Sequence, residues 1–207
     1  MNKSCSKKIC VSILMLAITM SLTACGKKES AKPMIGQERV VEQSRAAKPG
    51  WLYIRPNPDA SNLYFVGDDT ARNISGVRDA YQVALSKVSF YINSKVDAGY
   101  KRIENNLDND TANTLKQEMI QNVAKTSIQG AKEKEVYWEK VEKITQSGIN
   151  YYYRVYSLVA VPKNIIQETA KATLAAQQAK HKEEENKKTY EQLKNIEGDF
   201  QELFNEN

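Results

Sequence analysis

The chain has 207 residues and a formal net charge of +5, with 30 lysines and arginines, 25 aspartates and glutamates and one histidine. This length suits one ordinary domain with a tail. The basic residues are mixed with acidic ones rather than gathered in one patch, which argues against nucleic-acid binding. The sequence also holds no phosphate-binding glycine loop and no zinc-ligand spacing.

A secretory signal peptide is predicted at residues 1–24. Lys3, Lys7 and Lys8 precede a nearly continuous apolar run over residues 9–22, which ends in small residues before Cys25. This order is typical of a cleaved signal, and the run is shorter than the about 20 apolar residues that a membrane-spanning helix needs. Cleavage would remove the three lysines and lower the net charge from +5 to +2.

Cys25 is the predicted lipid attachment point. The ending Leu-x-Ala-Cys resembles the lipobox of bacterial lipoproteins, in which the cysteine thiol receives a diacylglycerol. Cys5 and Cys10 would leave with the signal, so Cys25 would have no partner for an internal disulfide. Two or more acyl chains are enough for stable anchoring. Gly26 replaces the aspartate that commonly retains lipoproteins in the inner membrane, so we expect a lipid anchor in the outer membrane.

Residues 25–48 are predicted to form the lipidated cysteine and a flexible tether. The segment after Cys25 is polar and charged, and its only apolar cluster is Val40-Val41. So few apolar residues cannot build a core. The folded domain is therefore expected at residues 49–163.

The first half of that domain is predicted to contain a strand, a helix and a second strand. Leu63–Val66 is a β-rich run that we expect to stop at Gly67. Apolar residues then recur at steps of three and four from Val77 to Tyr91, which predicts an amphipathic helix. After Phe90 the pattern changes: even positions hold the apolar Ile92, Val96, Ala98 and Tyr100, and odd positions hold the polar Asn93, Lys95, Asp97 and Lys101. This alternation predicts that the helix runs straight into a half-buried strand.

The second half is predicted to contain a helix and a β-hairpin. Leu115, Met119 and Val123 mark the helix, with Asp110 or Thr111 as its N-cap and a glycine at residue 130 as its C-terminal signal. The segment "VYWEKVEKITQSGINYYYRVYSLVAVP" reads as two strands joined by a turn at residues 146–150. The expected fold class is α+β, a small two-layer sandwich of helices on a mainly antiparallel sheet, followed by a long C-terminal helix.

Four segments carry a resemblance to a known family. In order they are "KPGWL", "LYFVGDDTA", "DAYQVALSKVSFYI" and "YYYRVYSLVAVPK". This succession resembles the twenty-kilodalton outer-membrane lipoprotein family, which is related to flagellar assembly lipoproteins. The resemblance covers residues 49–163 and implies a non-catalytic envelope scaffold or assembly factor, with an association with motility.

The tail, residues 164–207, departs from that family pattern. Its composition is helical, and Leu193, Ile196, Phe200 and Leu203 follow at steps of three, four and three. Such a stripe suits a partner helix or a second copy of the chain. It could equally fold back onto its own domain, and both interpretations stay open at this point.

The tyrosines of the last strand suggest a second interaction surface. Tyr152, Arg154 and Tyr156 alternate along it and therefore share one face. Aromatic rings interleaved with a cation can grip sugars, so a peptidoglycan or other glycan-binding module is the alternative function. Tyrosine also favours strands for reasons of packing alone.

Catalytic and metal-dependent functions find little support in the sequence. His181 lies in a charged stretch, where a nucleophile and base pair would have to be built from a solvated residue. The segment at residues 108–113 begins like a calcium loop, but Asn113 replaces the required glycine and Met119 the required glutamate. We therefore expect no catalytic residues, no cofactor and no metal, and an unrecognised hydrolase is the third hypothesis.

Overall fold

A computed structural model of the chain describes residues 34–54, 56–104, 106–183 and 186–205. Residues 35–207 form one compact unit, to which the description below refers. The predicted signal peptide, Cys25 and residues 26–33 of the expected tether lie outside the described residues. The elements are β1 (Glu38–Gln43), η1 (Gly50–Leu52), β2 (Asn62–Ala71), α2 (Gly76–Glu104), α3 (Asn109–Gly130), β3 (Lys132–Thr145), β4 (Gly148–Pro162), α4 (Lys163–Glu183), α5 (Lys187–Asn195) and α6 (Glu197–Asn205).

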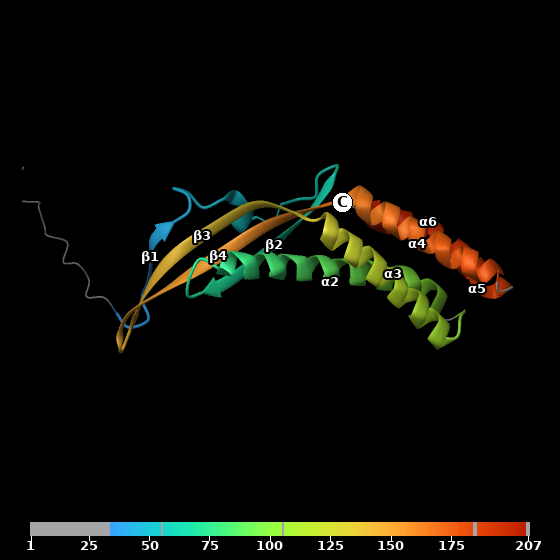
Figure 1. Cartoon of the computed structure of the whole chain (residues 1–207), viewed down its shortest axis with the longest axis horizontal. Helices are drawn as coiled ribbons and strands as arrows, with labels where there is room; N and C mark the ends of the chain where they lie inside the picture. Colours follow the sequence, from blue (N-terminus) through green and yellow to red (C-terminus); the bar gives the residue numbers. More distant parts are fainter. Residues whose placement is uncertain (1–33, 55, 105, 184–185, 206–207) are drawn as a thin grey trace, which may run out of the picture. The chain divides into compact units, whose positions relative to one another are not determined.

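The four strands form one antiparallel sheet in the order β1-β3-β4-β2, which confirms the α+β class (Figure 1). The predicted hairpin is present, because β3 and β4 pair from Lys132 and Ala160 to Thr145 and Gly148. Gly148 has a φ of 126°, a backbone conformation that favours glycine at this tight turn. Because β1 and β2 lie at opposite edges, the chain between them has to cross one face of the sheet.

The prediction of a strand after residue 91 is wrong, because α2 is one continuous helix through that segment. Ile92, Val96, Tyr100 and Ile103 are all buried, and their steps of four, four and three belong to a helix. Steps of four also keep apolar residues at even positions, so the same residues imitated a strand. Ala98 breaks the alternation, since it is exposed.

The predicted end of β2 at Gly67 is also wrong, since the strand runs on to Ala71. The glycine is there because α2 crosses the strand at this point. A Cβ at residue 67 would lie 1.9 Å from the Ala80 carbonyl oxygen and 2.5 Å from the Ala84 nitrogen. Glycine at residue 67 thus permits the close approach of α2 to β2, and it does not mark a turn.

The expected tether does not extend to residue 48, because residues 38–43 form β1. Backbone pairing joins Glu38 to Lys143, and Val40 to Val141. All six side chains of β1 are exposed, so the strand has no apolar pattern that the sequence could reveal. The folded unit therefore begins near Ile35 rather than at residue 49.

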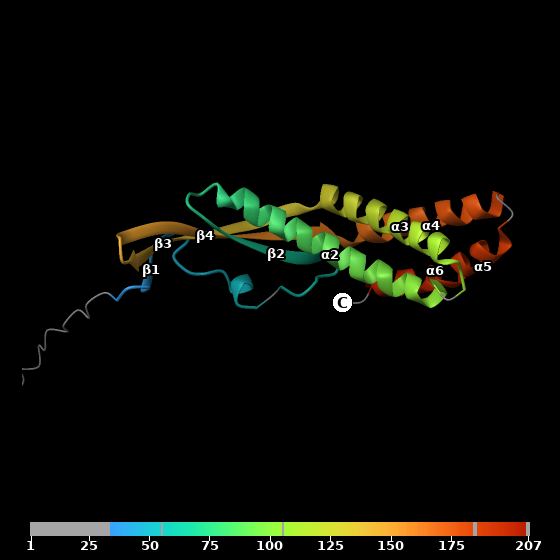
Figure 2. The ribbon, with the colours of Figure 1, turned by 90° about the horizontal axis from the view of Figure 1, so that it is seen from below.

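The helices form the second layer (Figures 1 and 2). The first half of α2 packs on β2 and β4, and its second half packs against α3 and α6. The N-cap of α3 is Asp108, whose side chain accepts a hydrogen bond from the Thr111 backbone N–H, so the predicted cap is wrong by two residues. The tail is not one long helix: α4 ends at Glu183, and α5 and α6 return along it.

Candidate functional site

The C-terminal stripe predicted as an interaction surface is largely part of the core. Leu193, Ile196 and Phe200 are 0%, 1% and 4% exposed, while Leu203 is half-buried. The Phe200 ring packs edge-on against Tyr100 of α2, with 5.5 Å between the ring centroids. The interpretation in which the stripe folds back onto its own domain is therefore the correct one, and the three buried residues offer no free surface.

The predicted tyrosine and arginine face lies on the side of the sheet opposite α2. Tyr152 and Arg154 of β4 stand beside Val141 and Glu139 of β3 in the strand register. Tyr156 stands beside Tyr137, and their rings stack with 6.2 Å between centroids. Tyr152, Arg154 and Tyr156 are half-buried, because other polar side chains cover them.

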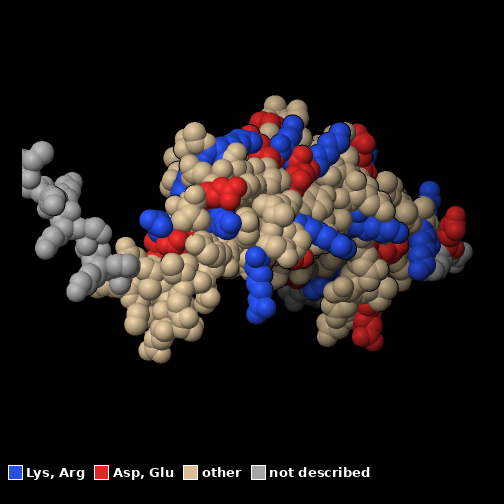
Figure 3. All heavy atoms as spheres, turned by 60° about the vertical axis from the view of Figure 1, so that its left-hand side comes forward, with Lys and Arg blue, Asp and Glu red and all other residues tan. Residues whose placement is uncertain are grey.

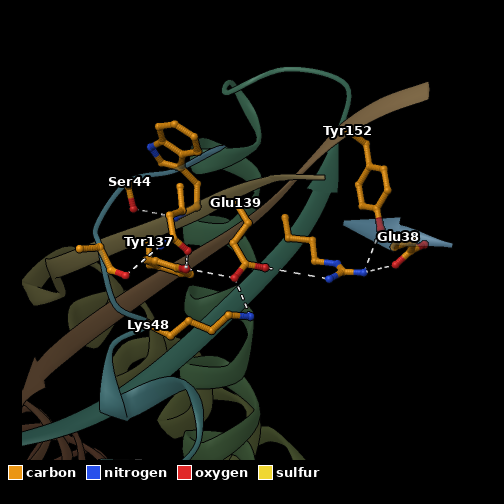
Figure 4. A network of polar contacts seen from close by, with 10 residues as sticks. Glu38, Ser44, Lys48, Tyr137, Glu139 and Tyr152 are labelled. Carbon is orange, nitrogen blue, oxygen red and sulfur yellow. Dashed lines mark hydrogen bonds and ion pairs between the residues drawn. The ribbon is translucent and has the colours of Figure 1, made fainter. Parts of the chain in front are cut away.

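The cover is the N-terminal strap, which we define as residues 35–54 and which contains β1 and η1. Figure 4 shows the polar contacts between it and the sheet. Lys48 Nζ lies 2.5 Å from Glu139 Oε1, which also accepts a hydrogen bond of 3.0 Å from the Tyr137 hydroxyl. Arg154 contacts Glu38 of β1 and donates to the Tyr152 hydroxyl at 2.9 Å.

Glu139 is the centre of this network, because its side chain is completely buried. A buried carboxylate is costly unless cations and hydrogen-bond donors compensate it. Lys48 meets Oε1, and Arg154 Nη1 lies 4.0 Å from Oε2. Oε2 has no hydrogen-bond donor among the described residues. We call these six residues the Glu139 network: Glu38, Lys48, Tyr137, Glu139, Tyr152 and Arg154.

Titration behaviour follows from these contacts. The hydrogen bond to Glu139 raises the pKa of Lys48 above its ordinary value. Burial, with the neighbouring Glu139 carboxylate, raises the pKa of the Tyr137 hydroxyl to about 12. The hydrogen bond from Lys143, followed by that from Tyr152, lowers the pKa of Glu38. At neutral pH these shifts favour a charged Lys48, a neutral Tyr137 hydroxyl and an ionised Glu38, which are the forms that make the contacts described above.

Further contacts attach the strap to β3 beyond the network. Ser44 and Trp138 exchange two hydrogen bonds, one from each backbone N–H. Arg45 and the indole N–H of Trp51 both contact Glu135 Oε2 at 2.9 Å. Hydrogen bonds and ion pairs thus fix the strap to the sheet along its length.

Sequence reasoning missed Lys48, Tyr137 and Glu139. A signal for Glu139 was present, because Tyr137, Glu139 and Val141 alternate on one strand face and the outer two are apolar or aromatic. A charge between them on such a face indicates a buried, paired group. Lys48 gave no such signal, since it stands in a segment without periodicity.

The surface of the described residues has grooves, but these residues form no metal cluster. Within the part of the chain that the structure covers, no group of three histidine, cysteine, aspartate or glutamate side chains is placed to bind a metal ion. None of the helices described there is long and apolar enough to cross a bilayer. One groove lies between α4 and α6. Another lies beside β2 and α2 and is lined by Trp51, Leu52, Phe65, Val66, Lys87, Phe90, Tyr91 and Ser94.

Comparisons of the chain with protein-family models, with curated proteins and with solved structures gave no match. The resemblance to the twenty-kilodalton lipoprotein family therefore depends on the four sequence segments alone.

Proposed function

We propose that this chain is a lipid-anchored, non-catalytic protein of the bacterial outer membrane that acts as an envelope scaffold or assembly factor. Cys25 carries the lipid, and the folded unit binds other envelope proteins. The resemblance to flagellar assembly lipoproteins makes a motility structure one candidate assembly. The observation that carries the proposal is the firm attachment of residues 35–54 to the sheet.

That attachment matters because it brings the fold close to the anchor. Ile35 stands ten residues after Cys25, and ten extended residues span at most about 35 Å. β1 and the Lys48–Glu139 contact hold the strap on β3, so a pull on the chain from Cys25 reaches the folded unit at Ile35 rather than at residue 49. A short connection of this kind keeps the binding surfaces of a scaffold close to its membrane attachment.

The chemistry of the Glu139 network supports a structural rather than a catalytic use. The Glu139 carboxylate is buried and contacts two cations and a tyrosine hydroxyl. A general acid or base has to reach a proton on a substrate, whereas these groups are turned toward one another (Figure 4). The network is therefore best explained as the attachment of the strap.

Glycan binding is the second candidate, and the groove beside β2 and α2 is the observation that favours it. Phe90 is 79% exposed at this groove, and Trp51 and Tyr91 also line it. Exposed aromatic rings in a shallow groove can stack on sugar rings. The face of Tyr152, Arg154 and Tyr156 is less suited, since its polar groups already contact the strap.

Two measurements test the anchor and the scaffold. Metabolic labelling with a radioactive fatty acid should label the wild type and not the Cys25→Ser variant. Equal labelling of both would overturn the lipid anchor. Crosslinking in intact envelopes, followed by affinity purification, should recover defined envelope proteins with the wild type and lose them with Cys25→Ser, which lacks the lipid and is left either uncleaved or released.

Sedimentation with purified sacculi separates the glycan alternative. A scaffold should stay in the supernatant, whereas a glycan-binding protein should sediment with the sacculi. Phe90→Ala removes an exposed ring without creating a cavity, so it should abolish sedimentation only if the groove binds glycan. Sedimentation that is lost in this variant, together with no crosslinked protein partner, would replace the scaffold proposal by the glycan one.

A further inference from the structure

The β3–β4 hairpin ends in an uncharged tip that no other element covers. Residues 144–153 are ten consecutive positions without an aspartate, glutamate, lysine or arginine. Figure 3 shows this end as a protrusion, at the lower left, that carries neither colour of charged side chain. Ile149 and Tyr151 on it are 56% and 51% exposed.

The tip is exposed because the hairpin is longer than its neighbours. The pairing of β2 with β4 ends at Ala71 and Tyr153, and α2 begins at Gly76 beside Ala71 and Val155. Residues of β4 before Tyr153 therefore extend past both β2 and α2. Ile149 and Tyr151 continue the apolar side of the sheet into a region where no helix packs on it.

The start of the strap is fixed to the same tip. The Gly36 backbone N–H donates to the Ile144 carbonyl at 2.8 Å, and the Ile144 N–H donates to the Gln37 carbonyl at 3.0 Å. Ile35, which is 68% exposed, therefore adds a third apolar side chain to this end of the unit. From here on, the tip means residues 144–153 together with Ile35, and its exposed apolar side chains are Ile35, Ile149 and Tyr151.

The first charges behind the tip are paired with each other. Glu38 lies 3.1 Å from Lys143, and Arg39 lies 3.0 Å from Glu142. The Tyr151 hydroxyl donates to Glu142 at 3.2 Å and Lys140 Nζ lies 5.4 Å from the centre of its ring, so Tyr151 links the exposed end of the hairpin to this charged zone. The end of the hairpin is thus amphipathic along its axis, with an apolar tip and a neutralised charged zone behind it.

We propose that this tip inserts into the headgroup region of the bilayer that carries the lipid on Cys25. This inference rests on the proposed lipid anchor. Ile35 is at most about 35 Å of extended chain from Cys25, so the tip is the part of the folded unit that the anchor holds nearest to the membrane. Tyrosine with aliphatic neighbours is the composition favoured at membrane interfaces.

A lipid surface suits the tip better than a protein does. A stable protein interface buries about 800 Å² on each partner, whereas the tip presents three separate apolar side chains at the end of a narrow hairpin. A segment that lies at the membrane surface needs only a few apolar side chains to insert when a lipid anchor already holds the protein at the membrane, because the anchor raises the local concentration of the segment there. The tip would then set the orientation of the domain rather than its affinity.

Site-specific fluorescence on the full lipidated protein tests the proposal. An Ile149→Cys variant is labelled with an environment-sensitive dye and reconstituted into phosphatidylethanolamine and phosphatidylglycerol vesicles. The acylated Cys25 has no free thiol, so the dye reports on position 149 alone. Asn113→Cys is the matched control, because Asn113 is exposed near the start of α3, at the other end of the unit (Figures 1 and 2).

The expected result is a blue shift and several-fold stronger quenching by headgroup spin-labelled lipid at position 149 than at position 113. Flotation of the vesicles is measured on the same samples. If the protein floats but position 149 behaves like position 113, the anchor stands and the tip proposal is wrong. If the protein does not float, the lipid anchor itself is refuted, and the tip proposal with it.

A variant within the tip gives an independent readout. The dye is attached to the cysteine of a Ser147→Cys variant, and the same labelled position is compared in a double variant that also carries Ile149→Asp. Insertion predicts that the charge reduces quenching at position 147 several-fold while flotation is unchanged. Shielding that appears only after envelope extract is added, and not with vesicles alone, would show that a protein covers the tip and would overturn the lipid assignment.

Discussion

Replacing Lys48 with methionine tests whether the Glu139 network fixes the strap. The substitution keeps most of the aliphatic stem but removes the ammonium group that lies 2.5 Å from Glu139 Oε1. The Glu139 side chain is completely buried, so it cannot turn to water when its partner is lost. The variant therefore leaves a buried carboxylate with weaker compensation.

The expected cost follows from what still contacts Glu139. Removing one partner of a buried ion pair costs about 3–5 kcal/mol when the other charge is left uncompensated. The Tyr137 hydroxyl and, at 4.0 Å, Arg154 still contact the carboxylate, and Lys48 itself is 39% exposed. We therefore expect Lys48→Met to lower the free energy of unfolding by about 2–3 kcal/mol, which is at or below the lower limit of that range.

Thermal and urea unfolding of the unlipidated chain from residue 26 measure this change. A protein of this size should lose about 5–10 °C in melting temperature. Lys101→Met is the matched control, because Lys101 forms an exposed pair with Asp97 at 3.6 Å on α2. Such a helix pair contributes only about 0.3–0.5 kcal/mol.

Glu139→Gln completes the comparison. Glutamine can still accept a hydrogen bond from Tyr137, and the partly exposed Lys48 can be solvated, so this variant should lose less than half as much stability as Lys48→Met. The double variant should lose less than the sum of the two. Equal losses for Lys48→Met and Lys101→Met, or strict additivity of Lys48→Met and Glu139→Gln, would refute the network as the attachment of the strap.

Three further predictions concern the rest of the fold. Gly67→Ala should lower the free energy of unfolding by about 1–3 kcal/mol or more, because its Cβ would lie 1.9 Å from the Ala80 carbonyl oxygen; a urea midpoint equal to that of the wild type would contradict this packing. Leu193→Ala should cost about 2–5 kcal/mol since Leu193 is fully buried, and a mass by light scattering that changes while stability does not would restore a role in association. The free energy of unfolding should fall as the pH rises from 10 to 12, because the pKa of Tyr137 is near 10 in the unfolded chain and about 12 in the folded one. The raised pKa of Lys48 acts in the same direction. Tyr137→Phe should make this pH dependence shallower in thermal melts.

The features that the sequence predicted correctly are those with a strong local period. The β3–β4 hairpin alternates over many residues and turns at a glycine, and α3 repeats buried residues at steps of four. In both, the side chains that face the core are set by the neighbours along the chain. Local pattern and tertiary packing agree there, which is why reading the pattern was enough.

The failures have a different physical origin, because they occur where a distant segment decides the outcome. β1 exists through backbone pairing with β3, and its exposed side chains carry no pattern. Gly67 is required by a helix that crosses it, not by a turn. The Glu139 network joins residues that lie about ninety positions apart in the chain, so no local window contains both partners.

The length of free chain decides how far the folded unit can move from a lipid on Cys25. A tether to residue 48 would reach about 75 Å or more, whereas a strap fixed from Ile35 leaves ten residues and about 35 Å. The concentration of the hairpin tip at the membrane falls roughly as the −3/2 power of linker length. Inserting ten Gly and Ser residues between Lys28 and Glu29 should therefore leave the melting temperature unchanged and lower the inserted fraction of the tip by about threefold, as read by quenching at position 149. Unchanged quenching with the longer linker would mean that the tip binds lipid strongly without help from the anchor, and a lowered melting temperature would mean that residues before Ile35 contribute to the fold.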